Sequence, residues 1–399
     1  MQPQNIREQF PALDQTVYGK PLVYLDNAAT AQRPISVIKC QEALQSGANA
    51  NIHRAVHRLA GDATEAYENT RAFVAKYLNA ASAQEIVFTS GATAAINLVA
   101  FSFGEAFIHE GDEIIVSVAE HHSNIVPWQM LCRRKNAVLK VLDIEKNGVL
   151  AADSLQKLIS QRTKIVAISH ISNVLGLVNP VQDLVAVSHK FGVPVLVDGS
   201  QGVVHCKVDV QQLDCDFYVF SGHKIYAATG TGVLFGKMEW LEKMPPYMGG
   251  GEMIKSVSFK ETIYAPVPTK FEAGTQSFNA VPTLKPALEF ASTYETDPSI
   301  LEYIYGKLIE DERVTLYGAE KSLKIPLFSF AVKGAHHEDL ALIMDKIGIA
   351  LRSGQMCAEP LMDRLGVTGL LRASFAPYNT IQEAEYFIKS LDKAIKMLI

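Results

Sequence analysis

The sequence from Asp214 to Gly232 reads DCDFYVFSGHKIYAATGTG. Its apolar, aromatic run from Phe217 to Phe220 predicts a short buried strand. The strand ends at Ser221 and Gly222, where glycine allows the backbone to turn sharply. Lys224 follows at once, and a lysine held there among polar groups can lose its proton and form a Schiff base with an aldehyde. The alternative is an ordinary surface lysine, which is the more common case for so short a motif taken alone.

The composition is that of a protein able to bury a substantial core. The chain has 399 residues, of which 48% are hydrophobic and 20% are charged, and this length predicts two domains, or one large and one smaller. The net charge of -5 argues against nucleic acid or an anionic membrane as the main partner. No apolar stretch reaches membrane-spanning length and the amino terminus has no apolar signal-like segment, so we expect a cytoplasmic protein.

The five cysteines are odd in number and lie far apart, at Cys40, Cys132, Cys206, Cys215 and Cys357. No two of them form a CxxC pair. The spacing therefore argues against both a disulfide framework and a zinc ribbon.

Strand and helix patterns alternate through most of the chain. Strands are expected at 86–88, 114–118, 138–142, 165–168, 195–197, 217–220 and 233–235, with helices over about 62–79, 93–101 and 181–190. Such alternation predicts an α/β fold with parallel strands and crossover helices on both faces. An irregular, loop-rich segment follows to about Val281, and later strands at 327–332, 349–352 and 371–375 suggest an α+β pattern. We therefore expect a large domain over 21–284 and a small domain made of 1–20 and 285–399.

Polar clusters follow five of the expected strands, where open α/β sheets bind their ligands. The clusters are Thr89–Thr93, Glu120–His122, His170–Asn173, Asp198–Gln201 and Ser221–Lys224. Glycine and hydroxyls before a helix can hold a phosphate on free backbone N–H groups, or simply cap the helix. The adjacent histidines could suggest zinc, but no cysteine or acid lies at ligand spacing, and an imidazole stacked on a planar cofactor fits one of them better.

Asp198 is the most informative residue of these clusters. A carboxylate directly after an apolar strand is either a turn former or the partner of a buried cation, such as a protonated ring nitrogen. A phosphate cradle, a stacking ring, an acid for a pyridinium and a lysine for an aldehyde together predict pyridoxal 5'-phosphate. Nicotinamide is disfavoured because no G-x-G-x-x-G follows a strand, and Gly230-Thr231-Gly232 lacks the third glycine.

Longer motifs extend this interpretation over nearly the whole chain. They are YLDNAAT at 24–30, EHHSNIVPW at 120–128, SNVLG at 172–176, SGHK at 221–224, FEAGT at 271–275, RASF at 372–375 and YNT at 378–380. In these motifs the chain resembles the class V aminotransferase family, and within it the group II (Suf-type) cysteine desulfurases and the similar cysteine sulfinate desulfinases. The resemblance implies the fold type I of pyridoxal-phosphate-dependent transferases, with a mostly parallel sheet and a smaller α+β domain, and a homodimer.

The resemblance also implies a role for each matching position. Around the cofactor ring, Lys224 would bind the aldehyde, Asp198 would pair the pyridine nitrogen, Gln201 would contact the ring oxygen, and His121 would stack on the ring and assist proton transfer. At the phosphate, the expected contacts are Thr93, Ser221 and His223, joined by Thr275 from the other subunit. Asn173 and Arg372 would bind the carboxylate side of the substrate.

Cys357 stands in the segment RSGQMC at 352–357, where the family places its sulfur-accepting cysteine. It follows a predicted strand, in a loop loosened by Gly354. A partly exposed thiol near a cation is more easily a thiolate, which is the nucleophile. The implied reaction takes sulfur from L-cysteine, leaves L-alanine and a persulfide on Cys357, and supplies a sulfur-acceptor protein of the iron–sulfur assembly system.

Three other functions remain open on the sequence alone. Selenocysteine lyase and cysteine sulfinate desulfinase activity use the same scaffold with L-selenocysteine or cysteine sulfinate. A non-catalytic sulfur-relay or assembly subunit with the same fold is a third, against which the intact Lys224, Asp198 and Cys357 argue.

The chain departs from the family pattern at three places. SGATA at 90–94 stands where RGTTE is usual, Ala227-Ala228 replaces a common Gly-Pro, and Gln355-Met356 replaces two histidines found in many members. The first change puts one hydroxyl contact to the phosphate in question. The third removes two histidines that could assist proton transfer near Cys357. None of the three removes a bond-making residue.

Overall fold

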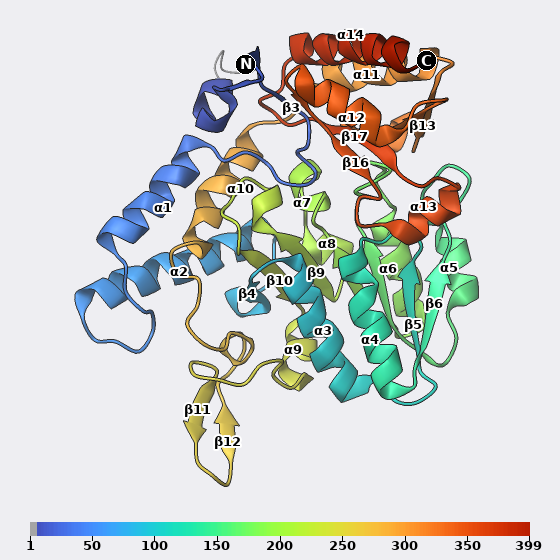
Figure 1. The fold of residues 1–399 in the computed structure, drawn as a ribbon. Coiled ribbons are helices and arrows are strands. Elements are labelled where there is room, and N and C mark those ends of the chain that lie inside the picture. The colour runs from blue at the N-terminus through green and yellow to red at the C-terminus, as the bar shows by residue number, and fades with distance from the viewer. Residues whose placement is uncertain (1–5) are drawn as a thin grey trace.

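The fold is built on a seven-stranded sheet, seen in the computed structural model, which describes residues 6–399 (Figure 1). The strands run in the order β4-β10-β9-β8-β7-β5-β6. Their bounds are β4 (Ile86–Thr89), β5 (Glu113–Ser117), β6 (Val138–Leu142), β7 (Thr163–Ser169), β8 (Val195–Asp198), β9 (Phe217–Ser221) and β10 (Gly232–Gly236). β10 is antiparallel to β4 and β9, and every other pairing is parallel. The predicted mostly parallel α/β sheet is thus confirmed.

Both faces of this sheet are buried, which explains its near-continuous apolar strands. Successive side chains of a strand point to opposite faces, so Phe217 and Val219 enter one core while Tyr218 and Phe220 enter the other. The first core is shared with α3 (Ala92–Phe107), α4 (Val126–Lys135) and α9 (Met238–Lys243). The second is shared with α1 (Ile35–Gly47), α2 (Arg58–Tyr77), α5 (Ala152–Leu158), α6 (Val181–Lys190), α7 (Gly202–His205), α8 (Val210–Leu213) and α10 (Leu284–Thr293).

The antiparallel strand β10 is the one departure from the expected parallel order. Only the short segment 222–231 joins it to β9, and a parallel return would need a crossover of a dozen or more residues. At Gly232 a Cβ would lie 2.4 Å from the Cα of Gly91. Glycine at this position therefore lets β10 approach the loop between β4 and α3.

A second sheet lies at the carboxyl-terminal end of the chain, shown in orange and red in Figure 1. Its four antiparallel strands run β13 (Val314–Tyr317), β14 (Leu327–Val332), β17 (Leu370–Ser374) and β16 (Arg352–Gly354). Its core is shared with α11 (Pro298–Glu310), α12 (His337–Lys346) and α14 (Ile381–Leu398). β3 (Val23–Tyr24) pairs in parallel with β15 (Ile349–Ala350), so the start of the chain packs against this sheet. The remaining helix, α13 (Glu359–Leu365), follows β16.

Four details differ from the expectations. β13 was not anticipated, and the single strand expected at 349–352 is divided into β15 and β16. After the 3₁₀ turn Arg7–Gln9, β1 (Thr16–Val17) and β2 (Lys20–Pro21) form a small hairpin that the sequence did not predict. The segment expected to be irregular holds the hairpin of β11 (Ile254–Val257) and β12 (Thr262–Tyr264), which extends from the body.

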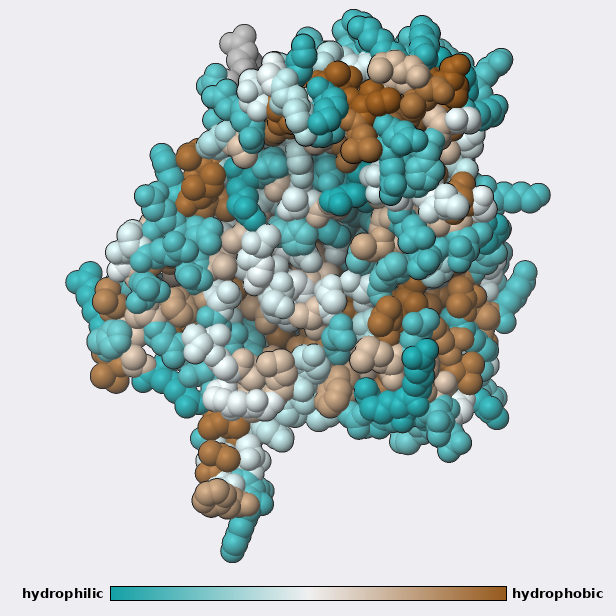
Figure 2. Space-filling model, viewed as in Figure 1, coloured by the Kyte–Doolittle hydropathy of each residue, from teal (hydrophilic) through white to brown (hydrophobic). Residues whose placement is uncertain are grey.

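The β11–β12 hairpin exposes apolar side chains, seen in brown in the lower part of Figure 2. They are Val257, Phe259 and Ile263, and the ring of the neighbouring Tyr264 is exposed as well. Across residues 6–399, no helix combines the length and apolarity needed to cross a membrane.

Candidate active site

A cavity of about 530 Å³ opens at the carboxyl ends of the parallel strands, where open α/β sheets place their ligands. It is lined by most of the residues singled out in the sequence: Thr93, His121, Asn173, Asp198, Ser221, His223, Lys224, Cys357 and Arg372. Gln201 and Thr275 do not line it. Side chains from both sheets therefore meet around one space.

Lys224 ends the 3₁₀ turn Gly222–Lys224 that follows β9. A Cβ at Gly222 would lie 2.2 Å from Oγ1 of Thr231, so glycine is needed where the chain turns. Burial lowers the pKa of the Lys224 ammonium, while the nearby Asp198 carboxylate opposes that shift. The amine is thus easier to deprotonate than an exposed lysine, as a nucleophilic amine requires.

Asp198 lies at the end of β8, the strand beside β9, and Gln201 follows it as the N-cap residue of α7. Asp198 is 7% exposed, and its Oδ1 accepts a hydrogen bond from the Ser200 N–H at 3.0 Å. Gln201 donates from Nε2 to the Ala28 carbonyl at 2.9 Å and faces a neighbouring cavity. The structure thus brings Asp198 to the site and places the Gln201 side chain at its wall.

His121 caps the 3₁₀ turn His122–Asn124 that follows β5. Its Nδ1 accepts a hydrogen bond from the Ser123 N–H at 3.1 Å, so the neutral ring carries its proton on Nε2. Burial, aided by the Lys224 charge, lowers the pKa of His121 to about 4. The imidazole is therefore uncharged at neutral pH, as suits a ring that stacks on a planar group.

Glu120 is fully buried beneath this turn and joins three segments. Its carboxylate accepts hydrogen bonds from Ser117 Oγ at 2.5 Å, Asn124 Nδ2 at 2.7 Å and the Ser169 N–H at 2.9 Å. Burial raises the pKa of Glu120 to about 7. No role for Glu120 was inferred from the sequence, although an acid directly before the histidine pair was a visible signal.

The amino terminus of α3 faces the same cavity and could hold a phosphate. Its N-cap, Gly91, offers no side-chain acceptor, and the Ala92 N–H donates to Ser221 Oγ at 2.8 Å. The next two N–H groups, at Thr93 and Ala94, have no acceptor in the part of the chain that the structure describes. Free N–H groups at a helix start bind anions, so the cradle fits a phosphate despite the unusual loop sequence.

The other phosphate candidates lie close to this helix start. Thr93 Oγ1 is 2.7 Å from Ser123 Oγ, and His223 Nδ1 is 3.3 Å from Thr30 Oγ1. Burial, helped by the charges of Lys224 and Arg33, lowers the pKa of His223 to about 4. The neutral ring can therefore act as a hydrogen-bond donor without adding charge.

Arg372 provides a buried cation on the opposite side of the cavity. Nη1 donates to the Asn173 carbonyl at 2.9 Å, and Nη2 lies 3.3 Å from Oδ1 of Asp26. Its Nε is buried without a partner among residues 6–399. A planar cation with an unused donor suits a carboxylate. Asn173 also lies here, but its Nδ2 donates to the Met356 carbonyl at 2.9 Å.

Cys357 is exposed and lies at the mouth of the cavity, in a tight turn after β16. Met356 and Cys357 both have left-handed backbone conformations, with φ of 55° and 54°. All five cysteines are free thiols, and the four others are buried or half-buried. Cys357 is therefore the thiol that a ligand in the cavity and an external protein can both reach.

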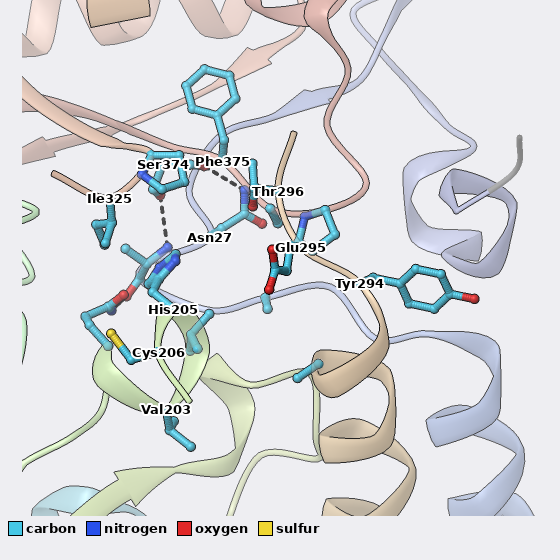
Figure 3. Close-up of a pocket in the computed structure, with 18 of the residues that line it drawn as sticks. Asn27, Val203, His205, Cys206, Tyr294, Glu295, Thr296, Ile325, Ser374 and Phe375 are labelled. Atoms are coloured by element: carbon cyan, nitrogen blue, oxygen red, sulfur yellow. Dashed lines mark hydrogen bonds between the residues drawn. The ribbon is translucent and has the colours of Figure 1, made fainter. Parts of the chain in front are cut away.

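A larger cavity, of about 670 Å³, adjoins the first (Figure 3). The two share Ala28 and Lys224 as lining residues. Asn27 Nδ2 donates to the Ser374 carbonyl at 2.6 Å, and the Ala28 N–H donates to Ser374 Oγ at 2.9 Å. These bonds fix the wall between the cavities, and the acid, the phosphate cradle and the thiol all lie on the side of the smaller one.

The histidine pair does not form part of a larger ligand set. Within residues 6–399, no group of three or more His, Cys, Asp and Glu side chains is placed to hold a metal ion. His121 and His122 have ring centroids 6.3 Å apart and tilted planes, and each ring has its own contacts.

Comparisons with known proteins agree with this geometry. The family model for aminotransferase class-V matches residues 23–387. The chain is 44% identical over 403 residues to a cysteine desulfurase of Cronobacter sakazakii, covering 99% of this chain and 98% of the relative. It is also 44% identical to a probable cysteine desulfurase of Halalkalibacterium halodurans, with 98% of each covered.

Solved structures show the same relationship. The cysteine desulfurase CsdA of Escherichia coli, in an S-sulfonic acid form, superposes with a TM-score of 0.91 at 40% identity over 100% of both chains. An apo cysteine desulfurase of Thermococcus onnurineus superposes with a TM-score of 0.93 at 32% identity, covering 99% of this chain and 98% of the other. The chain belongs to the class-V aminotransferase family, among its cysteine desulfurases.

Proposed function

We propose that this protein takes sulfur from L-cysteine, releases L-alanine and carries the sulfur as a persulfide on Cys357. The observation that carries the proposal is the shared cavity, which brings the Lys224 amine, the Asp198 carboxylate, the phosphate cradle and the Cys357 thiol together. The cysteine desulfurases of this family use pyridoxal 5'-phosphate. The donor set described above fits that cofactor at its aldehyde, its ring nitrogen and its phosphate.

When bound, the cofactor supplies an electron sink for the carbon atoms of the substrate. Residues of the protein bind the substrate and move its protons. Arg372 holds the substrate carboxylate with its unused Nε, and Lys224, with a pKa lowered by burial, accepts and returns a proton at Nζ. His121, neutral at working pH, covers the ring position and can donate from Nε2.

Cys357 performs the sulfur transfer. Its thiolate attacks the substrate sulfur, so that an S–S bond forms while the substrate C–S bond breaks. The electron pair of that bond stays with the carbon atom, which takes up a proton to give alanine. The exchange is redox-neutral overall, with one thiol consumed and one persulfide formed, and therefore needs no external oxidant.

The same proposal extends to partners. We infer a homodimer in which Thr275 completes the phosphate site of the partner subunit. Thr275 is exposed and lines a separate cavity of about 300 Å³, apart from Lys224, so it could contribute only from a second copy. The exposed position of Cys357 supports transfer of its sulfur to an acceptor protein, and we propose one of the iron–sulfur assembly system.

One experiment tests the proposed function. The purified protein is incubated with L-cysteine, L-selenocysteine or cysteine sulfinate, alanine is measured, and Cys357 is examined by mass spectrometry. We expect alanine from L-cysteine together with an added mass of one sulfur atom on Cys357. The Cys357→Ala variant should lose this reaction, while it retains more of its activity on the other two substrates, whose selenium or sulfinate leaves with less help from a thiol. No alanine from L-cysteine would disprove the proposal.

A further inference from the structure

His122 connects the turn that carries His121 to the turn that carries Cys357. The His122 backbone N–H donates to the Cys357 carbonyl at 2.7 Å. Its ring Nε2 accepts a hydrogen bond from the Glu359 N–H at 3.0 Å. His122 thus contacts the chain just after the thiol twice, with its backbone at the Cys357 carbonyl and with its side chain at the Glu359 N–H.

The contact with Glu359 serves as a helix cap. Glu359 is the first residue of α13, whose own N-cap residue, Ala358, makes no side-chain capping bond. The first N–H groups of a helix have no partner inside the helix and need an acceptor from elsewhere. A histidine that lies 237 positions earlier in the chain supplies one.

The Cys357 turn depends on such external contacts because its backbone is strained. Met356 and Cys357 are consecutive non-glycine residues with left-handed φ values, and each such residue costs free energy unless its surroundings impose the conformation. The other contacts on the turn are the bond from Asn173 Nδ2 to the Met356 carbonyl and the bond from the Ala358 N–H to the Gln355 carbonyl. In the described chain, His122 is the nearest hydrogen-bonded link between the carboxyl-terminal side of Cys357 and the main sheet, and farther along α13 Arg364 pairs with Asp143 at 2.8 Å.

We propose that His122 is a positioning residue, which holds the Cys357 thiol at the mouth of the active-site cavity by accepting the Glu359 N–H. The inference rests on the proposed function only for what Cys357 does there. The mechanical role follows from the hydrogen bonds themselves. Because His122 directly follows His121 in the chain, the position of the Cys357 thiol depends on the position of the His121 ring, which covers the cofactor site.

Three variants of the full-length holoenzyme separate this role from general structural damage. His122→Phe keeps a flat ring but has no acceptor. His122→Gln can place its amide oxygen where Nε2 lies, so it retains the acceptor. His336→Phe is a matched control, because His336 Nδ1 also caps a helix start, accepting from the Glu338 N–H at 3.3 Å on the exposed surface of α12.

The first measurement is hydrogen–deuterium exchange of the peptides that cover 354–362. We expect exchange in His122→Phe to be faster by roughly tenfold, the change that the loss of one good helix cap produces. His122→Gln and His336→Phe should exchange there as the wild type does. An exchange rate in His122→Phe equal to that of the wild type would overturn the proposal. Exchange in His122→Gln as fast as in His122→Phe would overturn it too, since a side-chain acceptor at this position would then not hold the turn. This readout does not depend on whether L-cysteine is the substrate.

The second measurement separates binding from transfer. In His122→Phe, the absorbance change that the bound cofactor shows on addition of L-cysteine should persist with a similar half-saturating concentration. The rate of persulfide formation on Cys357 should fall roughly tenfold, and His122→Gln should restore most of it. Loss of cofactor absorbance in His122→Phe, or a persulfide rate equal to that of the wild type, would contradict a positioning role.

Discussion

Two opposing influences act on the Lys224 ammonium, and they come from different residues. Burial favours the neutral amine, and Asp198, one strand away, favours the charged form. The balance leaves an amine that loses its proton more readily than an exposed lysine does, and a carboxylate that can pair with a ring nitrogen. We propose that the same carboxylate influences the reactivity of the amine before the cofactor binds and that of the cofactor afterwards.

Replacing Asp198 by Asn should therefore have two consequences. In the cofactor-free protein, the pKa of Lys224 should fall further, because the charge that raises it is gone. In the holoenzyme, alanine release should slow by about a hundredfold or more, the usual size of a lost acid–base partner. The pH dependence of Lys224 acylation and the rate of alanine formation measure the two effects, and an upward shift of the acylation midpoint would contradict the first.

We expect Glu120 to make the stability of the protein depend on pH. Its pKa is about 7 in the folded state and about 4.3 in an unfolded chain. Between these values the folded state binds the extra proton, so the free energy of unfolding should decrease as the pH rises from about 4.5 to about 7. The full effect is about 4 kcal/mol at most.

The Glu120→Gln variant isolates this contribution. Its amide does not titrate, so its free energy of unfolding should lack this part of the pH dependence. Urea unfolding of both proteins at pH 5 and pH 8 should show the advantage of the wild type shrinking at the higher pH. A constant difference between the two proteins would mean that Glu120 does not titrate in this range.

At the scale of residues, the sequence indicated the groups that follow strands directly. Asp198 was predictable because it directly follows a short apolar run, and Lys224 because it comes in the turn after another such run, which ends at Phe220. Glu120 and His122 were not, because their partners, the N–H groups of Ser169 and Glu359, are brought to them only by the folded chain. The direction of the Gln201 side chain, toward Ala28, was likewise hidden.

At the scale of elements, most strands and helices could be predicted from their apolar patterns. The errors concern strand direction and short or exposed strands. The apolar sequence of β10 predicts one more buried strand. Its antiparallel direction can be inferred only from the short link that follows β9. The β11–β12 hairpin was taken for irregular chain because its apolar side chains are exposed and proline and glycine surround it. β13 is a half-exposed edge strand of four residues, too short for its period to stand out.

The contact between β10 and the loop before α3 is a test at this scale. Gly232→Ala would place a methyl group against the Gly91 backbone, and neither chain segment can move without disturbing the sheet or the cradle. We expect a loss of about 1–3 kcal/mol in the free energy of unfolding, as for other overpacked cores, and weaker cofactor retention.

The matched control for that substitution is Gly61→Ala. Gly61 lies inside α2, and a Cβ there meets nothing within 4 Å. This change should leave stability equal or raise it by about 0.5–1 kcal/mol, because alanine favours a helix over glycine. Denaturant midpoints and the cofactor absorbance after dialysis report both outcomes. Equal stability of the two variants would mean that β10 and the loop have room to separate.

At the scale of the whole molecule, we propose that residues 21–284 and residues 1–20 with 285–399 act as two domains. The first five residues lie outside the described part of the chain. The separate core beneath β14 and β17 supports this division. β3 then links the two units, since it lies near the start of the larger one and pairs with β15 of the smaller one. The alternation of elements predicted the larger unit, but only the structure reveals this pairing.

The proposed dimer makes a prediction that needs two inactive proteins. Lys224→Ala lacks the essential amine, and Thr275→Glu would repel a phosphate in the partner subunit. Each homodimer should be inactive or weakly active. Mixed dimers, formed by co-expression with two different tags, should recover about half of the wild-type rate, because one of their two sites has a normal Lys224 and receives a normal Thr275 from the other subunit.

Purification over both tags isolates the mixed species, and alanine formation measures its activity. The control is the same pairing with Thr293→Glu, since Thr293 lies at the exposed end of α10 and its homodimer should be active by itself. A mixed dimer of the first pair that is no more active than its parents would show that Thr275 does not act across an interface.

Asp26 and Arg372 meet in the active site although 346 positions separate them in the chain. Ser374 donates from its N–H to the Leu25 carbonyl at 2.7 Å, which joins the same two distant segments beside them. A growing chain on the ribosome therefore holds Lys224 and Asp198 long before it has the residues that complete their surroundings. The pocket can close only after Ser374 has been synthesised, so a product that stops before it would present a reactive lysine without the residues that complete its site.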